Sequence, residues 1–170
     1  MLQAAGFVDD VVPMSRFAET VTKRAQEIAG DGHTGRTGIE LEALEPTMTE
    51  DGITYRHVNL AIDDAARTAT LEIKGPDEIS ALPEGDASVG SGWYPIRMFR
   101  ELDDALVRLR FNHPNIGLVI VKTQGDADKV MEMDAQLLSH QDTWYVKETL
   151  LLMKRVLKRL DLTARTVFAL

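Results

Sequence analysis

Ile116-Gly117-Leu118-Val119-Ile120-Val121-Lys122-Thr123 forms a short, nearly continuous apolar run in the second half of the chain. Runs of this kind are typical of a parallel strand that is buried on both faces of its sheet. Such a strand requires helices on each side, and the sequence around the run carries helical periodicity. The run therefore predicts an α/β fold.

A helix is predicted directly upstream of this strand, after Trp93-Tyr94-Pro95. A residue that precedes proline disfavours the helical conformation, so Asn112-His113-Pro114 marks the end of this helix. Its charged residues fall largely away from its apolar face. The apolar face consists of Ile96, Phe99, Leu102, Leu106 and Leu109, and the charged residues are Arg100, Glu101, Asp104 and Arg108.

Two further helices and a strand are predicted downstream. The sequence indicates a short helix over residues 130–138, a long helix over residues 144–160 and another buried strand over residues 166–170. The helix over residues 144–160 carries basic residues beside an apolar seam, and in this it resembles a membrane-surface or calmodulin-target helix. The strand predicted directly after it favours instead a helix that packs on a sheet. The seam is Val146, Leu150, Met153, Leu157 and Leu160, and the basic residues are Lys147, Lys154, Arg155, Lys158, Arg159 and Arg165.

A β-hairpin is predicted before these elements. Residues 55–63 alternate apolar and polar side chains, and residues 68–74 repeat the alternation. The four residues between the two strands suit a hairpin turn. On this alternation His57 shares a face with Tyr55 and Asn59, which predicts an exposed or half-buried face.

The first fifty residues are predicted to hold one helix and a linker. Apolar side chains at spacings of three and four, with Pro13 at the entry and Gly30 past the end, predict a helix over residues 14–29. Residues 30–52 are rich in glycine and polar groups and indicate a linker. Residues 30–35 match G-x-G-x-x-G, but this motif binds pyrophosphate between a strand and a helix. Because it follows a helix here, the sequence favours a helix cap and linker.

Composition and charge narrow the class of protein. Hydrophobic residues make up 44% of the 170 residues and charged residues 27%, which is typical of a soluble globular protein. The chain has no cysteine, which excludes disulfides and thiolate chemistry. The net charge is −8, with −10 in residues 1–90, so the basic field that attracts nucleic acid is missing. No apolar run approaches the roughly 20 residues of a membrane span, and we expect a cytoplasmic protein.

No catalytic or metal-binding cluster is predicted. The histidines do not share a helical turn with a further ligand, which argues against a metal site. Adjacent acids on a helix or strand point apart, so they are expected to be solvated rather than to act as general acid and base. The histidines are His33, His57, His113 and His140, and the acid pairs are Asp9-Asp10, Asp63-Asp64 and Asp103-Asp104.

Two stretches carry a resemblance to a known superfamily, namely Gly6-Phe7-Val8-Asp9-Asp10-Val11-Val12-Pro13 and residues 57–76. The first resembles the closing segment of crotonases (the enoyl-CoA hydratase/isomerase superfamily), and the second resembles their opening hairpin. The resemblance implies an incomplete crotonase-like ββα spiral in a chain cut at both ends. Residues 1–30 would be the C-terminal segment of a first domain, residues 31–52 a linker, and residues 53–170 the N-terminal part of a second, degenerate domain.

Five phrases carry a closer resemblance: Trp93-Tyr94-Pro95 and residues 100–105, 122–127, 144–149 and 165–170. They resemble the benzoyl-CoA-dihydrodiol lyase family, also called 2,3-epoxybenzoyl-CoA dihydrolases, which are tandem crotonase-like enzymes. The resemblance implies a lyase that opens the ring of 2,3-epoxybenzoyl-CoA with water and releases formate in aerobic benzoate degradation. It also implies an aryl-CoA thioester as substrate, no cofactor, and a homo-oligomeric full-length protein.

The catalytic parts of such an enzyme are not predicted in this chain. In crotonases two backbone N–H groups polarise the thioester carbonyl, and carboxylates activate water. Met131-Glu132-Met133-Asp134 stands where the superfamily shows Ala-Gly-Ala-Asp, and a bulky methionine hinders close approach of the backbone. The carboxylates of this family belong to its first domain. No catalytic residue is therefore assigned, and the chain alone is expected to be inactive.

Two other functions stay open at the level of sequence. One is a non-catalytic structural or dimerisation module with a crotonase-like fold, which would use the regions around Trp93 and Trp144 as contacts. The other is a dinucleotide-binding domain that uses residues 30–35. It predicts saturable binding of NAD, which we do not expect. Independently of these alternatives, Trp93, Tyr94, Trp144 and Tyr145 are predicted to be core or subunit-contact aromatics.

Overall fold

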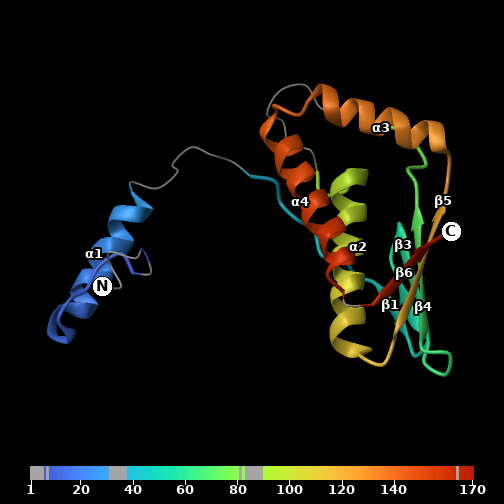
Figure 1. Ribbon diagram of the computed structural model, residues 1–170. Helices are drawn as coiled ribbons and strands as arrows, with labels where there is room; N and C mark the ends of the chain where they lie inside the picture. Colours follow the sequence, from blue (N-terminus) through green and yellow to red (C-terminus); the bar gives the residue numbers. More distant parts are fainter. Residues whose placement is uncertain (1–5, 7, 31–37, 81, 83–89, 164) are drawn as a thin grey trace. The chain divides into compact units, whose positions relative to one another are not determined.

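The computed structural model describes residues 6, 8–30, 38–80, 82, 90–163 and 165–170 (Figure 1). It divides the chain into two compact units, Met1–Gly38 and Ile39–Leu170. The origin of these units in two successive crotonase-like domains stays a prediction.

The first unit contains the short helix η1 (Met14–Arg16) and the helix α1 (Phe17–Ala29). The chain enters η1 at Pro13, and Gly30 ends α1 with φ +57°, a conformation that favours glycine. The Gly30 N–H donates to the Gln26 carbonyl at 3.0 Å. The predicted helix over residues 14–29 is confirmed. The G-x-G-x-x-G motif begins at this helix end, and its residues after Gly30 lie outside the described residues.

The second unit is a mixed α/β structure built on a six-stranded sheet with the order β1-β2-β3-β4-β5-β6 (Figure 1). Antiparallel pairing joins the first four strands, and β4, β5 and β6 are parallel. The α/β prediction is confirmed, while the crotonase-like spiral remains a prediction. The strands are β1 (Thr47–Thr49), β2 (Gly52–Thr54), β3 (Val58–Asp63), β4 (Thr68–Lys74), β5 (Leu118–Gln124) and β6 (Thr166–Ala169), and the helices are α2 (Tyr94–Asn112), α3 (Ala127–Ser139) and α4 (Trp144–Asp161).

The predicted hairpin is β3 and β4, with Asp63 paired to Thr68 next to the turn. The Asp63 carboxylate accepts a hydrogen bond from the Ala66 N–H at 2.8 Å, and Arg67 takes φ +57° to complete the turn. The hairpin is therefore stabilised by a side-chain hydrogen bond in its turn as well as by the backbone hydrogen bonds between β3 and β4.

The linker prediction for residues 31–52 is wrong for its last part, since β1 lies there and β2 starts at Gly52. Met48 pairs with Ile53, and Ile53 pairs with Leu60. Glycine and polar residues between these short strands conceal the alternation in the sequence. The Ile53 side chain is buried against the core, which explains why this segment joins the sheet.

The prediction that residues 116–123 are buried on both faces is also wrong. Val119 is buried, but Leu118 and Ile120, which point to the opposite face, are only half-buried. Helices α2 and α4 lie on one side of the sheet (Figure 1), and no helix covers the other side in the part of the chain that the structure describes. The apolar run reflects one covered face and one partly open face.

The core lies between the sheet and the apolar faces of α2 and α4. Leu102, Leu106 and Leu109 of α2 are almost completely buried, as the periodicity predicts. Burial of one such leucine side chain contributes roughly 1.5–3 kcal/mol relative to exposure. A second cluster joins α3 and α4 to the start of α2. Its members are Trp93, Ile96, Met133, Leu137, Tyr145 and Val146.

The aromatic residues divide between core and surface. Trp93 and Tyr145 are buried, with their rings edge-to-face at 6.2 Å between centroids, whereas Trp144 is 40% exposed. The core role predicted for these residues is confirmed for Trp93 and Tyr145.

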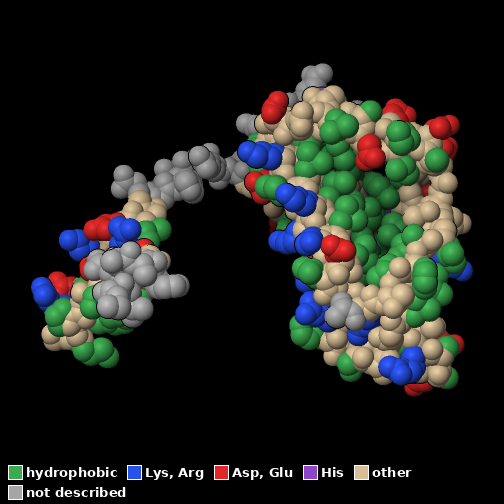
Figure 2. Space-filling model, viewed as in Figure 1, with side chains coloured by type: hydrophobic (Ala, Val, Ile, Leu, Met, Phe, Trp, Pro, Cys, Tyr) green, Lys and Arg blue, Asp and Glu red, His purple; other side chains and the backbone are tan. Residues whose placement is uncertain are grey.

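An open apolar groove separates α4 from β6 (Figure 2). Leu157 is 52% exposed, so the predicted α4 seam is covered only in part. The prediction of a buried strand over residues 166–170 is wrong in its burial, because all four residues of β6 and Leu170 are exposed. The groove has a volume of about 870 Å³. Its apolar lining consists of Leu150, Met153, Leu157, Leu160 and Val167.

Arg165 closes the C-terminal end of α2. Its guanidinium donates to the carbonyls of Ile116 at 2.6 Å, His113 at 2.8 Å and Leu109 at 3.4 Å. Leu109 lies in the last turn of α2, and the carbonyls of His113 and Ile116 belong to the segment that follows it. A cation beside the last turn of a helix can donate to its carbonyls and interact favourably with its dipole. Arg165, which the sequence places among the surface charges, thus ties the start of β6 to α2.

Replacing Arg165 by alanine is expected to lower the free energy of unfolding by about 2 kcal/mol, because three carbonyls lose a charged donor. Urea unfolding followed by circular dichroism measures the change. Lys147→Ala, an exposed change on α4, is the control and is expected to stay within about 0.5 kcal/mol of the wild type. Equal stability of the two variants would contradict the capping role.

Candidate functional site

The carboxyl ends of the parallel strands β4 and β5 form a partly enclosed place for a ligand. Ligands of open α/β sheets bind outside the carboxyl ends of the strands, where the loops diverge. Here the Gly75 N–H donates to the Gln124 carbonyl at 2.7 Å. Gly125 has φ +134°, and a Cβ at this position would lie 3.1 Å from the Gly75 nitrogen. The close approach of the two loops therefore requires glycine at position 125, whereas a Cβ on Gly75 would make only ordinary contacts, the nearest at 3.4 Å from Val130.

A cavity of about 410 Å³ lies beside this contact. Its walls are mostly apolar, and Thr123 and Asp126 are among the few polar residues that line it. The cavity is suited to an apolar group held against a small number of polar atoms. Its apolar side chains are Ile73, Tyr94, Met98, Ala127, Val130 and Met131.

The carboxylate of Asp126 is engaged in starting α3. It accepts a hydrogen bond from the Asp128 N–H at 2.9 Å, which satisfies one free donor at the helix N-terminus. The neighbouring loop is held by Lys129, whose ammonium donates to the Asp77 carbonyl. The acidic side chain nearest the cavity thus has a local structural role.

Residues 131–134 lie inside α3, which begins three residues before the predicted start at residue 130. Met133 is buried in the second core cluster, while Met131 is 67% exposed and lines the cavity. Amide groups inside a helix donate to carbonyls four residues earlier. The backbone here is therefore committed to the helix rather than directed at a ligand.

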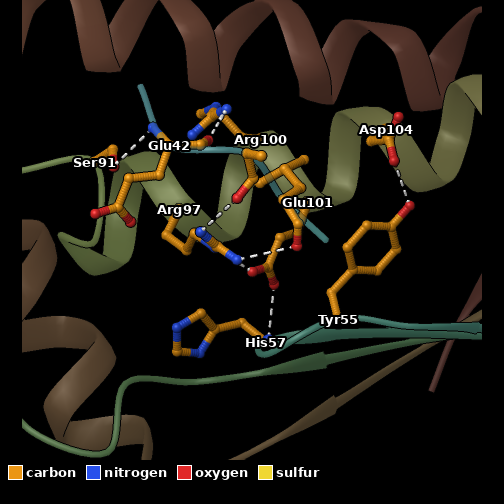
Figure 3. A network of polar contacts seen from close by, with 10 residues as sticks. Glu42, Tyr55, His57, Ser91, Arg97, Arg100, Glu101 and Asp104 are labelled. Atoms are coloured by element: carbon orange, nitrogen blue, oxygen red, sulfur yellow. Dashed lines mark hydrogen bonds and ion pairs between the residues drawn. The ribbon is translucent and has the colours of Figure 1, made fainter. Parts of the chain in front are cut away.

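A buried carboxylate, Glu101, joins α2 to the residue before β3 (Figure 3). Its Oε2 accepts a hydrogen bond from the His57 backbone N–H at 2.7 Å, and its Oε1 accepts from Arg97 Nε at 2.7 Å. The Arg97 guanidinium also donates to the carbonyls of Ala43 and Leu44. The prediction that Glu101 lies away from the core is wrong, because this network satisfies both of its oxygens.

The extended 42–44 segment is fastened to α2 by the same network (Figure 3). Arg100 donates to the Glu42 carbonyl at 2.8 Å, and the Glu42 N–H donates to Ser91 Oγ at 3.2 Å. Backbone groups without strand partners are thereby paired with side chains. This part of the predicted linker has a fixed place in the second unit.

His57 and Tyr55 are both buried, in contrast to the predicted exposed or half-buried face. The chain bends between β2 and β3, and the Tyr55 N–H donates to the Val58 carbonyl at 2.8 Å. The alternation of β3 therefore does not extend back to these residues. The His57 ring packs edge-to-face against Tyr94, with 5.0 Å between ring centroids.

Tyr94 presents a protonated hydroxyl beside the cavity. Burial, followed by the charges of Asp134 and Glu101, raises the pKa of Tyr94 to about 12. The hydroxyl donates to the Lys74 carbonyl at 2.8 Å. It is therefore a donor at neutral pH and holds the end of β4 in place.

The stability of the protein is expected to fall as the pH is lowered from 7 towards 5, because of His57. Burial lowers the pKa of its imidazole from the ordinary 6.5, with the Glu101 carboxylate opposing this shift and Arg56 adding to it. Below pH 6.5 the unfolded chain therefore takes up a proton before the folded one does, which favours unfolding. Urea unfolding between pH 5 and 8 measures the slope. His57→Gln is expected to flatten it, and a variant with the wild-type slope would refute the assignment.

The other candidate residues do not converge. Among the described residues no group of three histidine or acidic side chains could hold a metal ion, and His33 lies outside them. Asp103 pairs with Arg159 at 2.6 Å, while Asp104 pairs with Arg108 at 2.7 Å and accepts the Tyr55 hydroxyl at 2.6 Å. These two adjacent acids point to different partners, as predicted, but they are half-buried and ion-paired rather than solvated. Within the described chain, no helix has the length and apolar character to cross a membrane.

Fold and cavity together define a mixed α/β unit with an apolar pocket between two glycine-containing strand ends. No protein-family model matches the chain. The chain is 39% identical over 166 residues to benzoyl-CoA-dihydrodiol lyase of Aromatoleum evansii, an alignment that covers 96% of this chain and 30% of that protein. The chain therefore spans about 30% of the length of the curated relative it matches. The resemblance to this lyase is confirmed, and the link to the crotonase superfamily stays a prediction.

Proposed function

We propose that the chain is part of a CoA-thioester lyase that opens the ring of 2,3-epoxybenzoyl-CoA with water and releases formate in aerobic benzoate degradation. The observation that carries this proposal is the 39% identity to benzoyl-CoA-dihydrodiol lyase over 96% of the chain. The aligned part includes most of the sheet and of the helices that cover it, so the similarity extends well beyond a short motif.

The proposed architecture follows the same relationship. Residues 1–30 would close a first crotonase-like domain, and residues 53–170 would begin a second one whose own thioester site is degenerate. The helical commitment of residues 131–134 supports this view, because a thioester carbonyl needs two free amide donors. The complete enzyme is proposed to be cytoplasmic and homo-oligomeric.

The chain by itself is proposed to be inactive. Ring opening needs carboxylates that activate water next to the bound thioester. Asp126, which lines the apolar cavity, caps α3, and the buried Glu101 is tied to Arg97 and His57. The carboxylates of the reaction would therefore come from another part of the complete enzyme.

A chimera tests the assignment. The aligned 166 residues of the Aromatoleum evansii lyase are replaced by those of this chain, and formate release from 2,3-epoxybenzoyl-CoA is measured. We expect a folded chimera that retains activity, whereas the same lyase with a flexible linker in place of this segment is inactive. A chimera that folds and oligomerises without releasing formate would favour the non-catalytic structural module instead.

The isolated chain provides the second measurement. We expect no formate above the buffer control when the purified 170-residue protein is incubated with the same substrate. Turnover comparable with that of the complete relative would show that the catalytic carboxylates lie within this chain.

A further inference from the structure

Four cationic residues lie where α2 and α4 end. They line a hollow of about 210 Å³ together with Leu162. Three of them come from one face of α4, since positions three and four residues apart lie side by side on a helix. The four side chains are Arg110, Arg155, Lys158 and Arg159.

Nearby acids neutralise only part of this charge. Arg159 pairs with Asp103 at 2.6 Å, and Lys158 pairs with Asp161 at 3.2 Å in an exposed contact. Arg110 lies over the Phe111 ring at 6.0 Å. Neither Arg110 nor Arg155 pairs with a carboxylate in the part of the chain that the structure describes. The hollow therefore keeps a positive charge.

The helix dipole accounts for the position of three of these four cationic residues but not for that of Arg155. Cations in the last turn of a helix interact favourably with its dipole, and Arg110, Lys158 and Arg159 occupy such positions. Arg155 lies six residues before the end of α4, beyond the reach of this effect. Like charges three and four residues apart also repel each other. Arg155 forms no ion pair among the described residues, although it also lines a second hollow together with Asp103, Asp104 and Glu148.

The positive field extends into the neighbouring structure. Burial lowers the pKa of the Arg165 guanidinium, and the like charge of Arg110 lowers it further. Arginine presents a planar fork of donors that matches the oxygens of a phosphate group in pairs. Two arginines without carboxylate partners, with a lysine beside them, are the donor set that such an anion requires.

We propose that this hollow binds a phosphate group, either as inorganic phosphate or pyrophosphate or as the phosphates of a CoA-type nucleotide. The bound anion relieves the repulsion among the residues of α4. The site lies on the helices, and the apolar cavity at the strand ends has a separate lining. The proposed phosphate site does not depend on the proposed lyase activity.

Binding to the complete 170-residue chain tests the site without an activity assay. Inorganic phosphate, pyrophosphate and CoA are each titrated by calorimetry at low ionic strength. We expect saturable binding, tighter for pyrophosphate than for phosphate because it carries more charge. CoA tighter than pyrophosphate identifies the nucleotide as the ligand, and CoA no tighter identifies the inorganic anion. The absence of saturable binding of any of the three overturns the proposal.

Variants separate a binding role from a structural one. Arg155→Gln is expected to weaken pyrophosphate binding at least about tenfold and to leave the thermal midpoint unchanged or raised, because the repulsion is removed. Lys147→Gln, an exposed change on the first turn of α4, is the control and is expected to weaken binding less than about twofold. An equal loss of pyrophosphate affinity in the two variants, or a lowered thermal midpoint of unfolding for Arg155→Gln, contradicts a specific site.

Discussion

Glu101→Ala is expected to lower the free energy of unfolding of the second unit by about 3–5 kcal/mol, the range found when one partner of a buried ion pair is removed. The Glu101 side chain is fully buried and accepts hydrogen bonds from Arg97 and the His57 N–H, both at 2.7 Å. Without it the Arg97 charge, whose side chain is only 15% exposed, loses its counter-ion. The His57 N–H also loses its partner, so a buried donor is left unsatisfied beside a charge that keeps only the carbonyls of Ala43 and Leu44 as partners.

Urea unfolding followed by tryptophan fluorescence measures this loss. Glu132→Ala, which removes an exposed carboxylate from α3, is the matched control and is expected to change stability by no more than about 0.5 kcal/mol. Arg97→Ala combined with Glu101→Ala is expected to cost less than the two single changes added together, because the partners act as a unit. A purely additive double variant would show that the two residues are not coupled.

Sequence periodicity predicted the helices well because each has one continuous apolar face. The same reasoning misplaced Glu101, whose charge suggested an outer position. Met98, Glu101 and Ala105 are spaced by three and four residues and are all buried. They form a second stripe beside the main apolar face of the helix, and this spacing is the pattern from which the burial of Glu101 could have been predicted. The i,i+4 spacing of Arg97 and Glu101 also indicated an ion pair. Nothing in the sequence alone showed that the pair faces the interior.

The sheet was predicted for its longer strands and missed for its short ones. Three-residue strands such as β1 and β2 show too few alternations to be recognised. The contact between Gly75 and Gln124 joins loops about fifty residues apart, and only the parallel pairing of β4 with β5 brings them together. The apolar cavity beside them therefore could not be derived from local sequence patterns.

Gly52→Ala is expected to destabilise the second unit by about 3 kcal/mol, although the residue was predicted to belong to a linker. A Cβ on Gly52 would lie 2.3 Å from the Leu60 carbonyl oxygen and 3.2 Å from the Ala61 Cα. Both atoms belong to the main chain of β3, so no side-chain rotation can relieve the clash. The pairing of β2 with β3 would have to change, and Ile53 would then lose its buried position.

Gly117→Ala separates this steric effect from the general effect of replacing glycine. A Cβ on Gly117 would meet no atom within 4 Å, so this variant is expected to be as stable as the wild type or up to about 1 kcal/mol more stable. Urea unfolding and amide hydrogen exchange of β2 and β3 compare the two variants. If Gly52→Ala keeps wild-type protection in β2, the close approach of its backbone to Leu60 does not exist in solution. If protection is lost in β2 but kept in β4 and β5, the short strands were added to a sheet core that is stable without them.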